Sequence, residues 1–242
     1  MTDAHCHVRS GDGRHFLCAA TMGDWDRVAE ASAPDIRFYG VHPWEALAPE
    51  APDPVAVASA LRERLAADAV AGVGEIGLDR LREREIGPAM RELFRVQLEV
   101  AAEFGRPVAL HGAKCWGETV KAAEPYAGRI PAFIFHGFSR SGGLLPRMVA
   151  MGGYVTVGAA ALNDHAVNYR ELVKEIPLDR LLVESDRTAE NAEAIPPIGA
   201  IAAKVAEIRG MTESELVETV EANAERIWQW SSGTIVRWGQ QQ

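Results

Sequence analysis

Six side chains of the types that bind catalytic metal ions lie at or near the ends of short apolar segments of the sequence. They are His5, His7, Glu75, His111, His136 and Asp186. His42 ends another such segment, so five of the seven histidines in the chain occupy this kind of position. His15 and His165 do not. Imidazole and carboxylate groups repeated in this pattern indicate the ligands of a hydrolytic metal centre.

The spacing of His5 and His7 places both imidazoles on one side of an extended segment, because alternate side chains of a strand point the same way. Cys6 then points to the other side, which argues against it as a ligand. Four histidines and two carboxylates exceed the needs of one catalytic zinc ion, which takes three protein ligands and a water. We therefore expect two divalent ions (Zn, Mn or Mg), about 3.5–4 Å apart. One is assigned to His5, His7, Glu75 and Asp186, and the other to His111, His136 and the bridging Glu75.

Two such ions would lower the pKa of a bound water toward about 7 and stabilise charge on the group under attack. Asp186 has a second expected role, as the general base that accepts the proton of this water. Mixed imidazole and carboxylate ligation suits Zn, Mn, Fe or Co and does not choose among them.

Eight short segments, rich in β-branched and aromatic residues and bounded by Gly, Pro or Asp, are predicted as strands. They are 3–8, 15–21, 37–42, 71–78, 107–111, 132–138, 153–157 and 180–184. Amphipathic helices are predicted at 54–69, 88–104, 144–151 and 213–230, the last with a capping box at Thr212 and Glu215.

Eight strands alternating with helices in 242 residues predict a (β/α)8 TIM barrel, for which about 250 residues is typical. No linker divides the chain, so a single domain spanning 1–242 is expected. A doubly wound open sheet is the alternative, but no glycine-rich phosphate turn follows the first strand. In a barrel, the loops after the strands form the catalytic mouth, which would bring the six expected ligands together.

The composition is that of an ordinary soluble globular protein, with 48% hydrophobic and 24% charged residues. Asp and Glu outnumber Lys and Arg by 34 to 25, which excludes a uniformly basic surface but not a local basic patch. Three cysteines are too few for a disulfide framework. No apolar stretch reaches the ~18–20 residues needed to cross a bilayer, and no signal-peptide pattern is present, so a cytoplasmic location is expected.

The motifs around these residues resemble those of the TatD family of metal-dependent hydrolases. They are DAHCH at 3–7, GVHP at 40–43, GEIGLD at 74–79, PVALH at 107–111, HGFS at 136–139, DRLLVESD at 179–186 and ANAERIW at 222–228. The similarity covers nearly the whole chain in the family's order. It implies a barrel of the amidohydrolase superfamily, the six ligands named above and the deoxyribonuclease activity of most studied members. It also implies that His42 contacts the substrate phosphate or a further metal.

Several motif positions depart from the family's usual residues, and they concern substrate choice rather than the metal centre. Trp44 stands where the family commonly has a second histidine, and Arg80 stands where it has an aromatic residue. Arg140 and Arg187 are further departures, after the sixth and eighth predicted strands. We predict that Arg80, Arg140 and Arg187 belong to a positive collar that binds substrate phosphate, since guanidinium groups match phosphate oxygens. Its other members, on the loops after the first, fourth and fifth predicted strands, are Arg9, Arg14, Arg82, Arg84 and Lys114. The alternative is that they pair with neighbouring carboxylates.

Three other residues have two open interpretations each. Glu184 shares a strand face with Asp186 and is expected either to orient a metal ligand or to serve as a buried structural carboxylate. Trp44 and Trp116 are expected either to stack on a base of the substrate or to pack against the protein.

The leading interpretation is a nuclease acting on single-stranded or nicked DNA, or on another small phosphate-bearing substrate. The alternative is a carbonyl hydrolase of the same superfamily, cleaving a lactone, an amide or an aminoacyl ester, because the same centre would attack a carbonyl. A non-catalytic barrel is disfavoured, since all six expected ligands are present. Neither membrane association nor an obligatory protein partner is expected.

Overall fold

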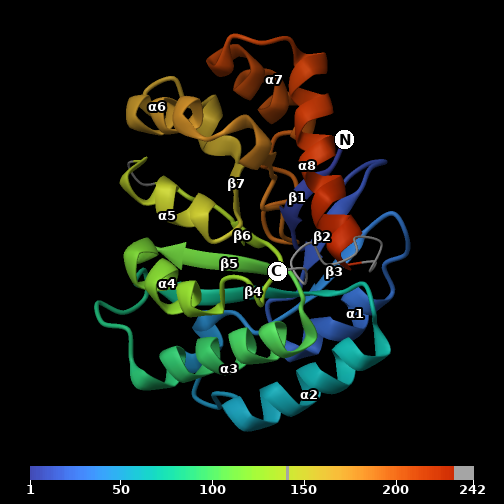
Figure 1. The fold of residues 1–242 in the computed structure, drawn as a ribbon, viewed down its shortest axis with the longest axis vertical. Coiled ribbons are helices and arrows are strands. Elements are labelled where there is room, and N and C mark those ends of the chain that lie inside the picture. The colour runs from blue at the N-terminus through green and yellow to red at the C-terminus, as the bar shows by residue number, and fades with distance from the viewer. Residues whose placement is uncertain (140–141, 232–242) are drawn as a thin grey trace, which may run out of the picture.

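In the computed structural model, eight parallel strands are hydrogen-bonded to their neighbours in chain order and form a barrel (Figure 1). The structure describes residues 1–139 and 142–231; the predicted collar residue Arg140 and the tail 232–242 lie outside them. The strands are β1 (Asp3–Cys6), β2 (His15–Cys18), β3 (Ile36–Tyr39), β4 (Gly72–Asp79), β5 (Val108–Ala113), β6 (Phe133–Phe135), β7 (Gly153–Val157) and β8 (Leu181–Val183). Each predicted strand segment overlaps one of them, and the predicted barrel is confirmed.

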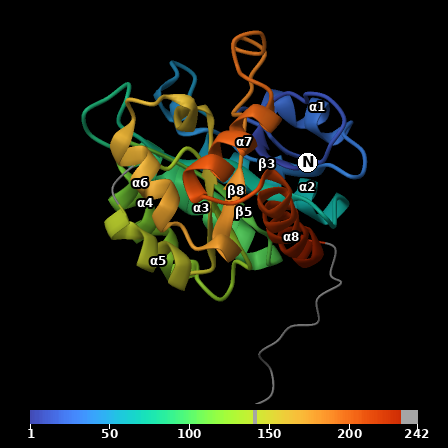
Figure 2. The same ribbon diagram turned by 90° about the horizontal axis from the view of Figure 1, so that it is seen from above.

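Helices surround the strands (Figures 1 and 2). In the described part of the chain they are α1 (Trp25–Ala29), α2 (Pro54–Ala67), α3 (Pro88–Phe104), α4 (Trp116–Ala123), α5 (Leu145–Ala150), α6 (Val167–Glu175), α7 (Ile198–Arg209) and α8 (Glu213–Ser231). Short 3-10 helices are η1 (Met22–Asp24), η2 (Pro43–Leu47), η3 (Glu124–Tyr126), η4 (Gly142–Leu144), η5 (Ala159–Leu162) and η6 (Leu178–Arg180). The four predicted helices correspond to α2, α3, α5 and α8. No described helix combines the length and the apolar character that crossing a bilayer requires.

Several helices begin and end at residues whose types favour a helix end. Asp53 caps α2 by accepting hydrogen bonds from two backbone N–H groups, and Pro54 follows at the first helical position. Gly105 ends α3 in the left-handed conformation, with φ of 60°. Thr212 and Glu215 exchange side-chain-to-backbone hydrogen bonds of 2.8 and 3.2 Å at the start of α8, which confirms the predicted capping box.

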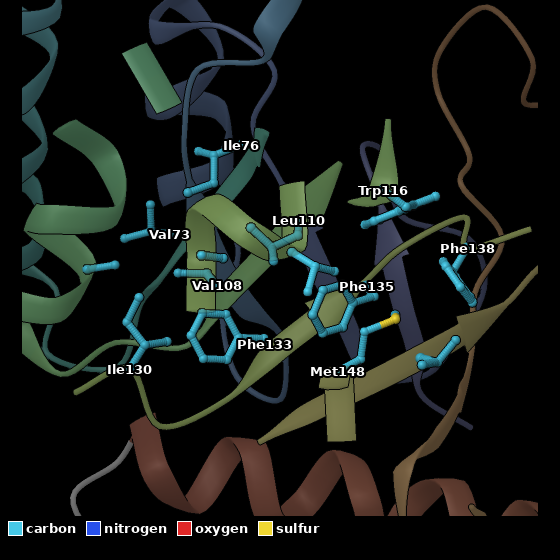
Figure 3. Close-up of a cluster of buried hydrophobic side chains, with 14 of the residues drawn as sticks. Val73, Ile76, Val108, Leu110, Trp116, Ile130, Phe133, Phe135, Phe138 and Met148 are labelled. Atoms are coloured by element: carbon cyan, nitrogen blue, oxygen red, sulfur yellow. The ribbon is translucent and has the colours of Figure 1, made fainter. Parts of the chain in front are cut away.

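Buried apolar side chains form one layer inside the barrel and another between the strands and the helices. The inner layer comprises Ala4, Phe16, Cys18, Ile36, Phe38, Ala109, Ala132, Ile134, Tyr154 and Leu182. Figure 3 shows part of the outer layer, where Phe135 lies near Trp116 of α4 and Met148 of α5. The strands are therefore buried on both faces, as parallel strands usually are.

The last helix covers the N-terminal end of the barrel. Ala224 and Ile227 of α8 pack with the inner layer. The amide of Asn223 donates a 2.8 Å hydrogen bond to the carbonyl of Leu181, the first residue of β8. Because α8 covers this end, the opening of the barrel lies at the other end, where the strands finish and the predicted ligands are found.

Residues that follow β8 join it to β1. The backbone N–H and the hydroxyl of Ser185 donate to the two carboxylate oxygens of Asp3, at 2.9 and 2.5 Å. The N–H of Asp186 donates to the carbonyl of His5 at 3.0 Å. Closure of the barrel and placement of Asp186 beside β1 therefore depend on the same short segment.

Candidate metal centre

Four imidazoles approach the carboxylate of Glu75 at the C-terminal end of the barrel. Oε2 of Glu75 lies 3.2 Å from Nε2 of His7 and 3.6 Å from Nε2 of His5. Its other oxygen, Oε1, lies 2.7 Å from Nδ1 of His111 and 2.8 Å from Nε2 of His136. Glu75 belongs to β4, while His5 and His111 belong to β1 and β5. The carboxylate is thus the common contact of histidines from different walls of the barrel.

Asp186 lies at the edge of this cluster. Its Oδ1 is 3.7 Å from Nε2 of His5 and 4.0 Å from Nε2 of His7. The side chain is 50% exposed, whereas that of Glu75 is 3% exposed. The backbone of Asp186 adopts the left-handed conformation, with φ of 51°, which is uncommon for a residue with a side chain and concentrates at functional sites. The amide of Asn191 holds this conformation by donating to the carbonyl of Asp186 at 3.1 Å.

Burial and charge act in opposite directions on Glu75. Burial alone would raise the pKa of this carboxyl, but the neighbouring imidazoles, His136 first among them, hold the pKa well below its usual range. Glu75 is therefore an anion. For His42, by contrast, burial is the larger effect and lowers the pKa of the imidazole to about 3, so this ring is neutral.

Hydrogen bonds to the remote nitrogens fix the orientation of His7 and His111. Nδ1 of His7 lies 3.1 Å from the carbonyl of Cys18, and Nε2 of His111 lies 2.8 Å from Oδ2 of Asp79. These oxygens can only accept, so each remote nitrogen carries a hydrogen, and the nearer nitrogen is the one left to bind a metal ion when it is present.

Glu184 lies behind the remote nitrogen of His136 at ion-pair distance, although these two atoms form no hydrogen bond among the described residues. Nδ1 of His136 lies 3.4 Å from Oε2 of Glu184, and Oε1 of Glu184 accepts a 2.8 Å hydrogen bond from the N–H of Gly137. A carboxylate or carbonyl behind the remote nitrogen is what ligating histidines usually have. Of the two interpretations of Glu184, the structure supports the one in which it orients a ligand.

The donor set fits a divalent cation. Nδ1 of His111 and Nε2 of His136 lie 3.4 Å apart beside the same oxygen of Glu75. Nε2 of His5 is buried and has no hydrogen-bond partner among the described residues. In three groups all ligand atoms lie within 4.8 Å of one another: His5, His7 and Glu75; His5, His136 and Asp186; His42, Glu75 and His111. Electron-rich atoms this close together are stabilised by a positive ion between them.

The predicted substrate-binding residues do not all lie beside Glu75. His42 joins the cluster, with Nε2 3.8 Å from Oε1 of Glu75. Arg80 pairs with Glu118 at 2.8 Å, and Arg187 donates to the carbonyls of Ala192 and Ile195 in its own loop. Arg80 and Arg187 thus have protein partners, and their contact with a substrate stays a prediction.

A cavity of about 660 Å³ opens over the cluster. Its walls are Leu81, His111, Gly112, Ala113, Lys114, Trp116, His136, Gly137, Ser139 and Asp186. A second cavity, of about 370 Å³, shares Lys114 and Trp116 with the first and also contacts Arg80 and Glu118. Figure 2 shows the segment between β8 and α7, which contains Asp186, projecting from one face of the barrel.

The two tryptophans differ in their surroundings. Trp116 is 4% exposed and packs against Phe135 and Phe138, with ring centroids 5.8 and 5.5 Å away, so most of it belongs to the core. Trp44 meets the ring of His42 edge-on at 4.7 Å, and the guanidinium of Arg82 lies over its face at 3.7 Å.

Asp79 was not singled out by the sequence analysis. Asp79 and Glu75 are four residues apart in β4, so their side chains point to the same face of the strand. This shared strand face, within the GEIGLD motif, is the signal from which a contact between Asp79 and a ligand of the metal centre could have been inferred.

Comparisons with known proteins agree on one family. The family model described as TatD related DNase matches residues 6–229. The uncharacterized metal-dependent hydrolase YabD of Bacillus subtilis (strain 168) is 27% identical over 177 residues, 69% of each chain. A protein of Pectobacterium carotovorum named 3'-5' ssDNA/RNA exonuclease TatD is 30% identical over 185 residues, 72% of this chain and 71% of that one. The crystal structure of YJJV, a TatD homologue from Escherichia coli K12, shares the fold with a TM-score of 0.76 and 24% identity, covering 93% of this chain and 96% of that one.

Proposed function

Because the chain belongs to the TatD family of metal-dependent hydrolases, we propose that it cleaves phosphodiester bonds of single-stranded nucleic acid at the centre around Glu75. The observation that carries this proposal is the convergence of four imidazoles on one carboxylate beside an open cavity. The choice of nucleic acid is supported by the relative that is named an ssDNA/RNA exonuclease and is 30% identical to this chain.

We propose that two divalent ions, Zn, Mn or Mg, are held by the six ligands predicted from the sequence. Glu75 would be shared between them, because its two oxygens face different histidines. When bound, such ions supply a nucleophilic water at neutral pH and stabilise the charge that develops on the phosphate.

Asp186 is the proposed general base. Its carboxylate lies in the cavity wall, is half exposed and stands beside His5, so it can reach a water that attacks a phosphorus atom in the cavity. The other carboxylates of the centre are less suited to this task. Glu75 is buried among imidazoles, and Glu184 is engaged by the N–H of Gly137.

His42 and Arg80 are the proposed contacts of the substrate phosphates among the described residues. His42 faces Glu75, and Arg80 lines the neighbouring cavity. Arg140 and Arg187 stay in the proposal as predicted contacts, although Arg187 would have to share its guanidinium with the carbonyls of its own loop.

Hydrolysis of a short labelled single-stranded DNA tests the proposal. Protein stripped of metal and resupplied with Mg, Mn or Zn is expected to cleave it, and Asp186→Asn is expected to lower kcat by about 10²–10⁴-fold. Asp164→Asn, at an exposed aspartate on the surface, is the matched control. No cleavage with any metal by protein that has bound the ion, together with turnover of a lactone or an ester, would overturn the nuclease proposal.

A further inference from the structure

His42 differs from the other imidazoles of the centre in the partner of its remote nitrogen. Nδ1 of His42 accepts a hydrogen bond from the backbone N–H of Trp44, with 3.2 Å between the nitrogens. A backbone N–H can only donate, so Nδ1 of this ring carries no hydrogen. In a neutral imidazole the hydrogen must then be on Nε2, the nitrogen that faces Glu75.

The local chain fixes this arrangement. His42 is the N-cap residue of η2, and Pro43 occupies the first position of that helix. The N–H of Trp44 is one of the donors that a helix start leaves without a backbone partner, and the imidazole accepts from it. The rings of Trp44 and His111 pack edge-to-face with the imidazole of His42, at centroid distances of 4.7 and 4.5 Å. Rotation of this imidazole by 180° would therefore displace both rings.

His7, His111 and His136 show the opposite pattern. Their remote nitrogens face a carbonyl or a carboxylate, so their near nitrogens are the ones left to bind a metal ion. Binding of a metal ion requires a lone pair on the near nitrogen, and Nε2–H of His42 has none to give. Although His42, Glu75 and His111 lie close enough together to hold an ion, His42 is not suited to be one of its ligands.

We propose that His42 is a catalytic hydrogen-bond donor and not a metal ligand: its Nε2–H donates to a non-bridging oxygen of the phosphate under attack. This inference rests on the proposed phosphodiesterase function. Nε2 of His42 is 3.8 Å from Oε1 of Glu75, which is beyond hydrogen-bond distance, so that oxygen does not use the donor. No proton is transferred in this role; the ring stays neutral and stabilises negative charge as it develops on the oxygen.

Two substitutions separate the possible roles of His42. Asn in His42→Asn retains an acceptor for the N–H of Trp44, since Asn is a favourable N-cap residue, but has no donor at the position of Nε2. Gln in His42→Gln is longer and can bring an amide N–H toward that position. Removal of one donor to a developing oxyanion typically costs about 10²–10³-fold in kcat. We expect a kcat loss of this size in His42→Asn, a smaller loss in His42→Gln and the wild-type metal content in both.

The metal content decides between donor and ligand. Loss of a metal equivalent in both variants, at a melting temperature close to that of the wild type, would overturn the proposal, and so would an unchanged kcat in His42→Asn. A ¹⁵N NMR spectrum of the metal-loaded wild type gives a second readout that does not depend on a variant. It is expected to show His42 protonated at Nε2, and an unprotonated Nε2 would contradict the proposal.

Failure of the proposed phosphodiesterase function gives a result that differs from failure of the role inferred for His42. A metal-loaded wild type that hydrolyses esters but no phosphodiester would overturn the phosphate as the acceptor of this hydrogen bond. The metal content and the NMR signal of His42 would still show whether the residue is a ligand.

Discussion

The imidazoles of His5 and His136 lie face to face, with ring centroids 3.9 Å apart and ring planes inclined by 13°. The two residues come from β1 and from the position directly after β6, and each also approaches Glu75. The ligand groups expected from the sequence for two separate ions are therefore in direct contact. His5 groups with His136 and Asp186 as closely as with His7 and Glu75, so the assignment of each histidine to one ion stays a prediction.

Asp79→Asn is expected to weaken metal binding without unfolding the barrel. The carboxylate holds Nε2–H of His111 at 2.8 Å and thereby points Nδ1 at the centre. Loss of such a supporting group typically lowers metal affinity by about 10–100-fold. Titration against a chelator of known affinity measures the change, with Asp164→Asn as the control. An unchanged affinity would show that His111 is positioned without Asp79.

Arg80→Ala is expected to raise KM for an oligonucleotide substrate by about tenfold or more and to leave kcat nearly unchanged. This increase in KM corresponds to the loss of one hydrogen bond to a charged group. The residue lines the smaller cavity, next to the one over the metal centre. Arg91→Ala is the matched control, because Arg91 lies 3.9 Å from the same carboxylate of Glu118 but is absent from the walls of both cavities. Equal KM values for the two variants would show that Arg80 serves only its pair with Glu118.

Gly77→Ala is expected both to destabilise the protein and to disturb the metal centre. A Cβ at Gly77 would lie 2.0 Å from the carbonyl oxygen of His111, at the point where β4 pairs with β5. Overpacking of this kind costs about 1–3 kcal/mol and sometimes more. Urea denaturation and metal content measure both effects. Gly199→Ala in α7, where a Cβ meets nothing within 4 Å, is expected to be neutral or stabilising. Equal stabilities of the two variants would contradict the steric interpretation.

Asp68→Asn is expected to destabilise the protein in a pH-dependent way. Arg37 donates to both carboxylate oxygens of Asp68, at 2.5 and 2.8 Å, and Tyr39 donates at 3.0 Å. Burial alone would raise the pKa of Asp68, but the bonds from Arg37 outweigh it and lower the pKa. A carboxyl whose pKa is lowered on folding stabilises the fold above its unfolded value of about 3.9, and this contribution is lost as the pH falls through the folded pKa.

At pH 7 the variant is therefore expected to lose about 1.5–3 kcal/mol of unfolding free energy, the usual range for hydrogen bonds to a charged group. The difference from the wild type should shrink as the pH is lowered below about 4. Denaturation curves at several pH values measure it. Asp26→Asn, at an aspartate that pairs with Arg64 but is 91% exposed, should change little. A constant difference between pH 7 and pH 3 would contradict the role assigned to Asp68.

The barrel and the convergence of its polar residues could be predicted because both depend on local patterns. Each expected ligand lies within a buried strand or soon after one, and the spacing of His5 and His7 already places both on one side. The single-domain assignment to 1–242 stays a prediction.

The partners of those residues depend on contacts between segments that are distant in the sequence, so local patterns could not predict them. Glu184, directly after β8, meets His136, directly after β6, across the intervening strand β7. Arg187 reaches carbonyls of its own loop only because that loop folds back. Trp116 follows a strand just as a ligand would, yet it packs into the core against Phe135. Its residue type could not distinguish a stacking surface from a core position.

The central claim is that Glu75 is shared by two ions, and the metal content of the loaded and desalted protein tests it most directly. We expect two equivalents per chain in the wild type, about one in His7→Gln, and a loss of binding at both positions in Glu75→Gln, with folding confirmed by the melting temperature. A single equivalent in the wild type, or two equivalents retained in Glu75→Gln, would contradict the claim.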